Sequence, residues 1–93
     1  MITLSAKITF RILDVHSLKD KRMVARSLID RTRHKFNASV AEVDMQDTHQ
    51  ILVLGIAVVS GEYLHAVKMI DEIIRFMEEA TSAEIISVES CLS

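Results

Sequence analysis

One run of residues restricts the fold of this chain more than any other, the segment ILVLGIAVVS at positions 51–60. The run contains no charged residue and is apolar at both odd and even positions. It is much shorter than the roughly 20 apolar residues of a membrane-spanning helix, and no other apolar stretch is longer. A strand that is apolar on both faces is typical of the centre of a sheet. The other elements are therefore expected to surround a central strand over residues 51–60.

The N-terminal segment predicts a second long strand. From Ile2 to Leu13 every even position is apolar, whereas the odd positions up to Arg11 are polar or charged. This period of two indicates a strand with one buried face. Ser17 then stands three residues before Asp20, a pattern that predicts a helix N-terminus at about Leu18. We expect this helix to end at Asn37, because asparagine tolerates the left-handed conformation.

The remaining elements follow from the same periodicities. We expect a strand at 38–45, a polar turn at 46–50, a helix at 62–80 and a last strand at 83–92. The core row of the second helix is Tyr63, Ala66, Val67, Ile70, Ile73, Ile74 and Met77, and the last strand places Ile86, Val88 and Leu92 on one face. With right-handed crossovers, this order predicts one α+β domain over residues 1–93. It is a ferredoxin-like βαββαβ sandwich, a four-stranded antiparallel sheet with two helices on one face.

Charge is distributed unevenly along the chain. Residues 1–36 hold nine of the 11 Lys and Arg residues and three of the 13 Asp and Glu residues, giving +6. Residues 37–93 hold the other two basic and ten acidic residues, giving −8, so the sum is the formal net charge of −2. Such asymmetry indicates either a surface for a polyanion or two surfaces that attract each other between molecules.

A row of basic residues on the first predicted helix is the main candidate site. With Leu18 at 0° on a helical wheel, Arg22, Arg26 and Arg33 lie within about 40° of one another, and Lys19 extends the row. Arginine presents a planar fork to phosphate, so we hypothesise that the nucleic-acid-binding residues are Lys19, Arg22, Arg26 and Arg33. The alternative is an ordinary solvated helix flank, in which Arg26 pairs with Asp30.

Catalytic and metal sites are less well supported. Asp44, Asp47 and His49 cluster around one turn, but short polar residues are also common in turns, so we expect no metal site. Glu42 and Asp44 are expected to share one face of a strand, as an acid–base pair would, although exposed carboxylates also protect edge strands. Cys91 has no histidine near it in sequence, and we interpret it as a buried, unreactive thiol. We expect neither an enzyme nor a cofactor.

Three segments carry a resemblance to a known family: HSLKDKR at 16–22, FNASVAEVDMQD at 36–47 and LGIAVVS at 54–60. In these, the chain resembles the YlxP-like family of small uncharacterised bacterial proteins over essentially its whole length. The matching signature residues are His16, Ser17, Lys19, Lys21, Arg22, Asn37, Ser39, Glu42, Asp44 and Asp47. The resemblance implies a ferredoxin-like fold. It also implies a cytoplasmic accessory role near the ribosome, since genes of this family often lie among those for ribosome maturation and translation initiation.

The sequence therefore predicts a non-catalytic cytoplasmic protein that binds RNA or the ribosome through its basic first helix. A single cysteine and the absence of a secretory pattern favour the cytoplasm. The alternative is a self-associating structural or protein-interaction module. The central strand supports association, because two helices cover only one side of a sheet. A row of apolar residues from 51–59 is left on the open face, and we expect a homodimer to cover it.

Overall fold

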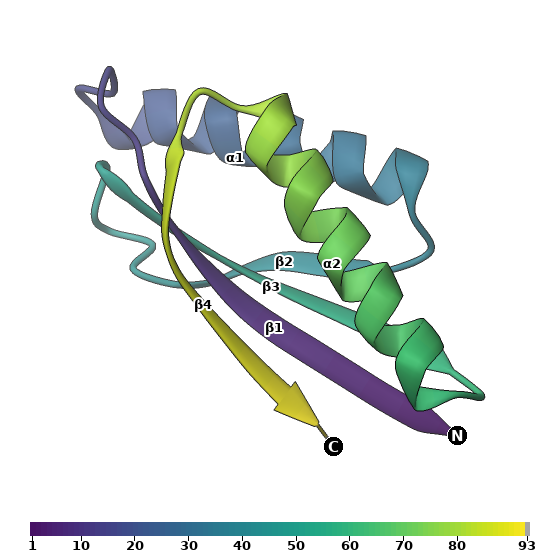
Figure 1. The fold of residues 1–93 in the computed structure, drawn as a ribbon. Helices are drawn as coiled ribbons and strands as arrows, with labels where there is room; N and C mark the ends of the chain where they lie inside the picture. Colours follow the sequence, from purple (N-terminus) through teal and green to yellow (C-terminus); the bar gives the residue numbers. More distant parts are fainter. Residues whose placement is uncertain (93) are drawn as a thin grey trace.

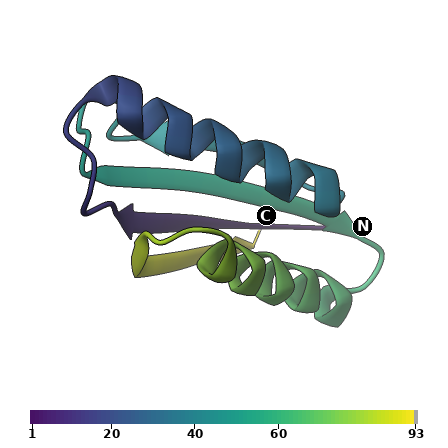
Figure 2. The ribbon, with the colours of Figure 1, turned by 90° about the horizontal axis from the view of Figure 1, so that it is seen from above.

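The computed structural model describes the backbone of residues 1–92 and the side chains of residues 1–90. The elements are β1 (Ile2–Arg11), α1 (Leu18–Lys35), β2 (Ser39–Asp44), β3 (Ile51–Ser60), α2 (Tyr63–Ala80) and β4 (Glu84–Leu92). The strands form one antiparallel sheet in the order β2-β3-β1-β4 (Figure 1). Both helices lie on the same face of this sheet and run in opposite directions (Figure 2). The predicted ferredoxin-like βαββαβ sandwich is confirmed.

The core lies between the sheet and the helix pair. The even-numbered residues of β1 and β3 face the helices, and Ile8, Phe10, Leu52 and Leu54 are completely buried. From α2, the buried residues are Ala66, Ile70, Ile73 and Met77. Tyr63 was predicted to belong to this row, but it is 49% exposed because it stands in the first turn, beyond the edge of the core.

The C-terminus of α1 differs from the sequence-based prediction. The helix ends at Lys35, and its C-cap Phe36 is extended, with φ of −123°. Asn37 does not have a positive φ; among the described residues, Met45 is the non-glycine residue that does. The Phe36 ring packs edge-to-face on Phe76 of α2, with 5.6 Å between the ring centroids. This contact favours an extended Phe36 that turns its ring toward α2, so no left-handed residue is needed at the helix end.

A bulge interrupts the alternation of β4. Ser87 pairs with Thr9, but Ile85 pairs with Phe10, so Ile86 is an extra residue in the ladder. By register, Ile85 and Val88 are on the helix side, opposite Phe10 and Ile8. The prediction that Ile86 and Val88 belong to one alternating row is therefore wrong, because a bulge breaks the period of two. The side chains of Leu92 and Cys91, for which burial was also predicted, lie outside the described residues.

The open face of the sheet carries the odd-numbered residues of β1 and β3. On β3 these are Ile51, Val53, Gly55, Ala57 and Val59. Gly55 has a specific neighbour on the adjacent strand, since a Cβ built on it would lie 2.8 Å from Cγ1 of Val43. Val43 is thus folded over Gly55 and occupies the space of the missing side chain. The open face has a glycine in the middle of its central strand because β2 bulges over it.

We predict that Gly55→Ala destabilises the protein by about 1–3 kcal/mol, since the new methyl group and Val43 cannot occupy the same space. Urea denaturation would measure the change. Gly61→Ala is the matched control, because nothing lies within 4 Å of its built Cβ and its φ is not positive. The control should be neutral or slightly stabilising. Adding Val43→Ala to Gly55→Ala should recover stability, and an unchanged loss in the double variant would contradict this account.

Candidate nucleic-acid interface

The start of α1 is fixed by the cap that the sequence predicted. The Ser17 side chain accepts a hydrogen bond from the backbone N–H of Asp20 at 3.1 Å, and Ser17 has extended backbone angles. Asp20 in the first turn also suits the positive end of the helix dipole. His16, one residue earlier, is exposed. The segment 16–20 therefore acts first as a helix start.

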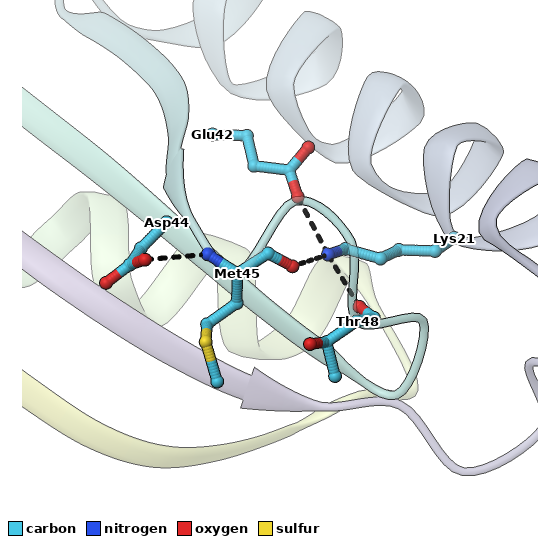
Figure 3. A network of polar contacts seen from close by, with 5 residues as sticks. All are labelled: Lys21, Glu42, Asp44, Met45 and Thr48. Carbon is cyan, nitrogen blue, oxygen red and sulfur yellow. Dashed lines mark hydrogen bonds and ion pairs between the residues drawn. The ribbon is translucent and has the colours of Figure 1, made fainter.

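Lys21 in the next turn is the most unusual residue of the structure, because its side chain is only 1% exposed. Its ammonium group donates hydrogen bonds to the carbonyl oxygens of Met45 at 2.7 Å and Thr48 at 2.8 Å (Figure 3). Oε2 of Glu42 is 2.9 Å from the same nitrogen. Two of the three donors of the ammonium group are thus used in hydrogen bonds, and the carboxylate beside them balances its charge. Lys21 thus fastens α1 to the turn between β2 and β3 and presents no charge to solvent.

Glu42 completes this clamp from the middle of β2. Its Oε2 atom is buried and receives no hydrogen bond of good geometry from the described residues, so the 2.9 Å contact with Lys21 is an ion pair rather than an aligned hydrogen bond. The Glu42 side chain is 21% exposed, so it is the more solvent-exposed residue of the pair. Burial of a lysine needs a partner of this kind, since an uncompensated buried charge is strongly destabilising.

Asp44 lies on the other side of the sheet from Glu42. Glu42 pairs with the buried Leu54, whereas Asp44 pairs with Val53 of the open face, because Val43 is an extra residue between them. The prediction that the two carboxylates share one face is therefore wrong, and this arrangement gives no acid–base pair. Instead, Oδ1 of Asp44 accepts a hydrogen bond from the Met45 backbone N–H at 2.8 Å (Figure 3). Asp44 thereby supports Met45 in its left-handed conformation, with φ of 55°.

The turn that follows closes on itself. Thr48 donates its backbone N–H to the Met45 carbonyl at 3.0 Å, and Asp47 is exposed within this turn. Within the described part of the chain, no three His, Cys, Asp or Glu side chains lie close enough to hold a metal ion. Asp44 thus has a backbone partner that accounts for it without a metal.

The arginine row forms one wall of a groove between α1 and β2. Arg22, Arg26 and Arg33 all line this groove of about 350 Å³, which also contains Ala25, Ile29, Asp30, Ala41 and Glu42. All three arginines are exposed. Within residues 1–90, no ion pair involves Arg22 or Arg26, and the Arg26–Asp30 pair of the alternative interpretation is not formed. The structure thus brings together the three arginines that the helical wheel predicted to be neighbours.

Arg33 and Lys19 differ from the other two members of the row. Arg33 donates from Nη2 to the Val40 carbonyl at 2.6 Å, so its guanidinium is held against the edge strand β2. Lys19 is exposed but does not line the groove; it stands one turn before Arg22, at the start of α1. The signature residues Asn37 and Ser39 lie in the connection to β2 and at its first position, and both are exposed.

The groove has a positive formal charge once its neighbours are counted. The three arginines contribute +3, and Asp30 and Glu42 contribute −2. Lys21 adds +1 beside Glu42, which brings the local sum to +2. Other basic residues of α1 are used elsewhere: Arg31 donates to the Ala80 carbonyl at the end of α2, and Lys35 lies 4.9 Å from the Phe76 ring centroid.

The burial of Lys21 in the core was not among the expectations from the sequence. Lys21 is three positions after Leu18 and four before Ala25, so helical spacing places it on the buried stripe. A lysine at such a position signals a buried partner, and the partners come from residues 24 and 27 positions away in the chain. Periodicity within one helix does not identify partners at that separation.

We predict that Lys21→Met destabilises the protein by about 3–5 kcal/mol, since it leaves Glu42 and two carbonyls without their buried partner. Glu42→Gln should cost about 2–3 kcal/mol, less than Lys21→Met, because it removes the counter-charge of the buried ammonium while Lys21 keeps both carbonyls. Lys19→Met, the same change at an exposed position of the same helix, should stay within about 0.5 kcal/mol. Chemical denaturation of the three variants would measure this, and equal losses for Lys21→Met and Lys19→Met would rule out the clamp.

Comparison with known proteins agrees with the resemblance seen in the sequence. Residues 3–90 match the family model described as "Protein of unknown function (DUF503)". The chain is 36% identical over 73 residues to "Uncharacterized protein YlxP" of Bacillus subtilis (strain 168), and the alignment covers 78% of this chain and 79% of that protein. No helix among the described residues is both long and apolar enough to cross a membrane. On these matches, the chain belongs to the DUF503 family of proteins of unknown function and is similar to the YlxP protein of Bacillus subtilis.

Proposed function

We propose that this protein is a non-catalytic, cytoplasmic accessory protein that binds RNA or the ribosome through the groove between α1 and β2. The observation that carries the proposal is the convergence of Arg22, Arg26 and Arg33 on one groove. Arginine is weakly hydrated and binds phosphate with two parallel hydrogen bonds, so a row of arginines suits a phosphate backbone.

The lack of ion pairs at Arg22 and Arg26 within residues 1–90 supports this proposal over a solvated helix flank. In such a flank, acidic side chains three or four residues away can form weak ion pairs with the basic ones. Asp30 is four residues after Arg26 and lines the same groove, yet it forms no ion pair with Arg26. Arg22 and Arg26 therefore keep their hydrogen-bond donors available for a ligand.

The chemistry of the groove favours phosphates over bases. Its lining contains no aromatic side chain on which a base could stack. The aromatic residues Phe36 and Phe76 are engaged with each other and with Lys35. Binding through the backbone depends little on sequence and responds strongly to salt. We infer that RNA shape and charge, rather than base identity, select the target.

We predict that the double variant Arg22→Glu/Arg26→Glu loses retention on RNA or on ribosomal particles while keeping its unfolding midpoint. Wild-type binding should weaken steeply with salt. Removing two phosphate contacts should lower the slope of log K against log salt by about 1.4–1.8, since each contact contributes about 0.7–0.9. Fluorescence anisotropy with a labelled RNA at several salt concentrations, together with gradient sedimentation of ribosomal particles, would measure both effects.

Lys68→Glu/Arg75→Glu is the matched control, because it makes the same charge change at two exposed positions of α2. This control should retain most of the binding. An equal loss in both double variants would point to net charge alone. Binding that responds neither to the reversal in α1 nor to salt would leave the arginine row as a solvated helix flank.

A further inference from the structure

The open face of the sheet has two halves of different character. The half formed by β2 and β3 carries Val43, Ile51, Val53, Gly55, Ala57 and Val59; Val43 is 48% and Val59 61% exposed, whereas Val53 is only 4% exposed. The half formed by β1 and β4 is polar and contains two ion pairs, Lys7–Glu89 at 3.5 Å and Arg11–Glu84 at 4.0 Å. The β2–β3 half of the open face therefore suits an apolar partner. The β1–β4 half suits the solvated edge of an interface.

The shape of the β2–β3 half is complementary to the same half of a second copy. A hollow of about 880 Å³ crosses the sheet from β2 to β4: small residues such as Ser39, Gly55 and Ala57 line it on the β2–β3 side, and Lys7 and Glu89 line it on the β1–β4 side. Val43 rises beside it, over Gly55. In the register of the two strands, Val43 lies beside Val53, and Ser39 lies beside Ala57. These two positions are on opposite sides of Gly55 along β3. A two-fold axis through Gly55 exchanges these two levels, so it brings the ridge of one copy over the hollow of the other.

We propose that a second copy of this chain covers the open face, as a two-fold pair in which β3 crosses β3 at Gly55. The two-fold axis lies in the plane of the interface and runs perpendicular to the strands. It therefore places the β2–β3 half of one copy on the β2–β3 half of the other. The same operation brings Asp44 near the Ser39 end of the second copy. Arg33 lines the hollow at that end, so opposite charges meet at both ends of the pair.

The charges of this face favour a second copy over a nucleic acid. Lys7 and Arg11 are the cations of β1 on this face, and each has a glutamate of β4 beside it. Their sum with Glu84 and Glu89 is zero, so a polyanion gains little here. The ion pairs leave this half of the face without net charge, so two copies can approach, although the axis at the level of Gly55 places Lys7 opposite Lys7 of the second copy. The pair also leaves Arg22 and Arg26 uncovered, because they lie in the groove beside α1.

The available area is enough for a dimer at the lower end of stable interfaces. The four strands have 10, 6, 10 and 9 residues, and at about 3.3 Å per residue and about 4.8 Å between strands they present a footprint of roughly 550 Å². Two such faces bury about 1,100 Å², just above the roughly 1,000 Å² that a specific interface needs.

Sedimentation equilibrium of the protein alone, from about 1 to 500 μM, tests the proposal. We expect about 21 kDa at the upper end, twice the 10.5 kDa of one chain. Ala57→Arg should remain a monomer over the same range, because the two-fold axis brings each new guanidinium close to the apolar row of the second copy. Ser27→Arg, at an exposed position of α1, is the matched control and should dimerise as the wild type does.

Ser39→Arg provides a second test at the exposed start of β2, in case Ala57→Arg perturbs β3; urea denaturation would check the fold of each variant. It too should prevent dimerisation. A wild-type monomer at 500 μM would overturn the proposal, as would a dimer insensitive to both variants, which would place the interface elsewhere. A monomeric wild type whose RNA retention is lost in Ala57→Arg would assign the face to nucleic acid instead. These measurements need no RNA, so they stand apart from the test of the arginine groove.

Discussion

The ammonium group of Lys21 connects three parts of the chain that would otherwise meet only through apolar packing. It binds the N-terminal part of α1 to the carbonyls of the β2–β3 turn and to Glu42 of the edge strand. Hydrophobic contacts are non-directional and leave a helix some freedom to slide over a sheet. Two directional hydrogen bonds and an ion pair on one nitrogen specify one position. The groove that holds the arginines depends on this position, because α1 and β2 form its two walls.

The clamp also explains much of the family signature. Ser17 starts the helix, Lys21 and Glu42 form the buried pair, and Asp44 supports the left-handed Met45 whose carbonyl Lys21 binds. These contacts give each of these signature residues a structural role. The arginines that follow on the exposed side of α1 are not needed for the clamp. Their presence in one groove is what supports a binding function.

Periodicity predicted the order of the elements, the ferredoxin-like topology and the arginine row, because each depends on a repeat within one segment. Besides Tyr63 and the bulge at Ile86, it failed at three places where contacts between segments decide. Lys21 is polar in a buried stripe because its partners come from another element. The chain leaves α1 through an extended Phe36 because its ring packs on Phe76. Glu42 and Asp44 separate because Val43 bulges over Gly55. A bulge shifts all later residues of a strand, and no local pattern marked it.

Both outer strands of the sheet are interrupted, β2 at Val43 and β4 at Ile86. On β2, the Arg33 guanidinium additionally occupies the Val40 carbonyl. A regular outer strand would be a template for a further strand, and then for another, which is how open-ended fibres grow. Bulges twist and shorten the stretch that could act as such a template. The bulges thus disfavour the addition of a further strand at either edge of the sheet. The chain can therefore keep an apolar central strand at high concentration without the risk of polymerising along its hydrogen-bonding direction.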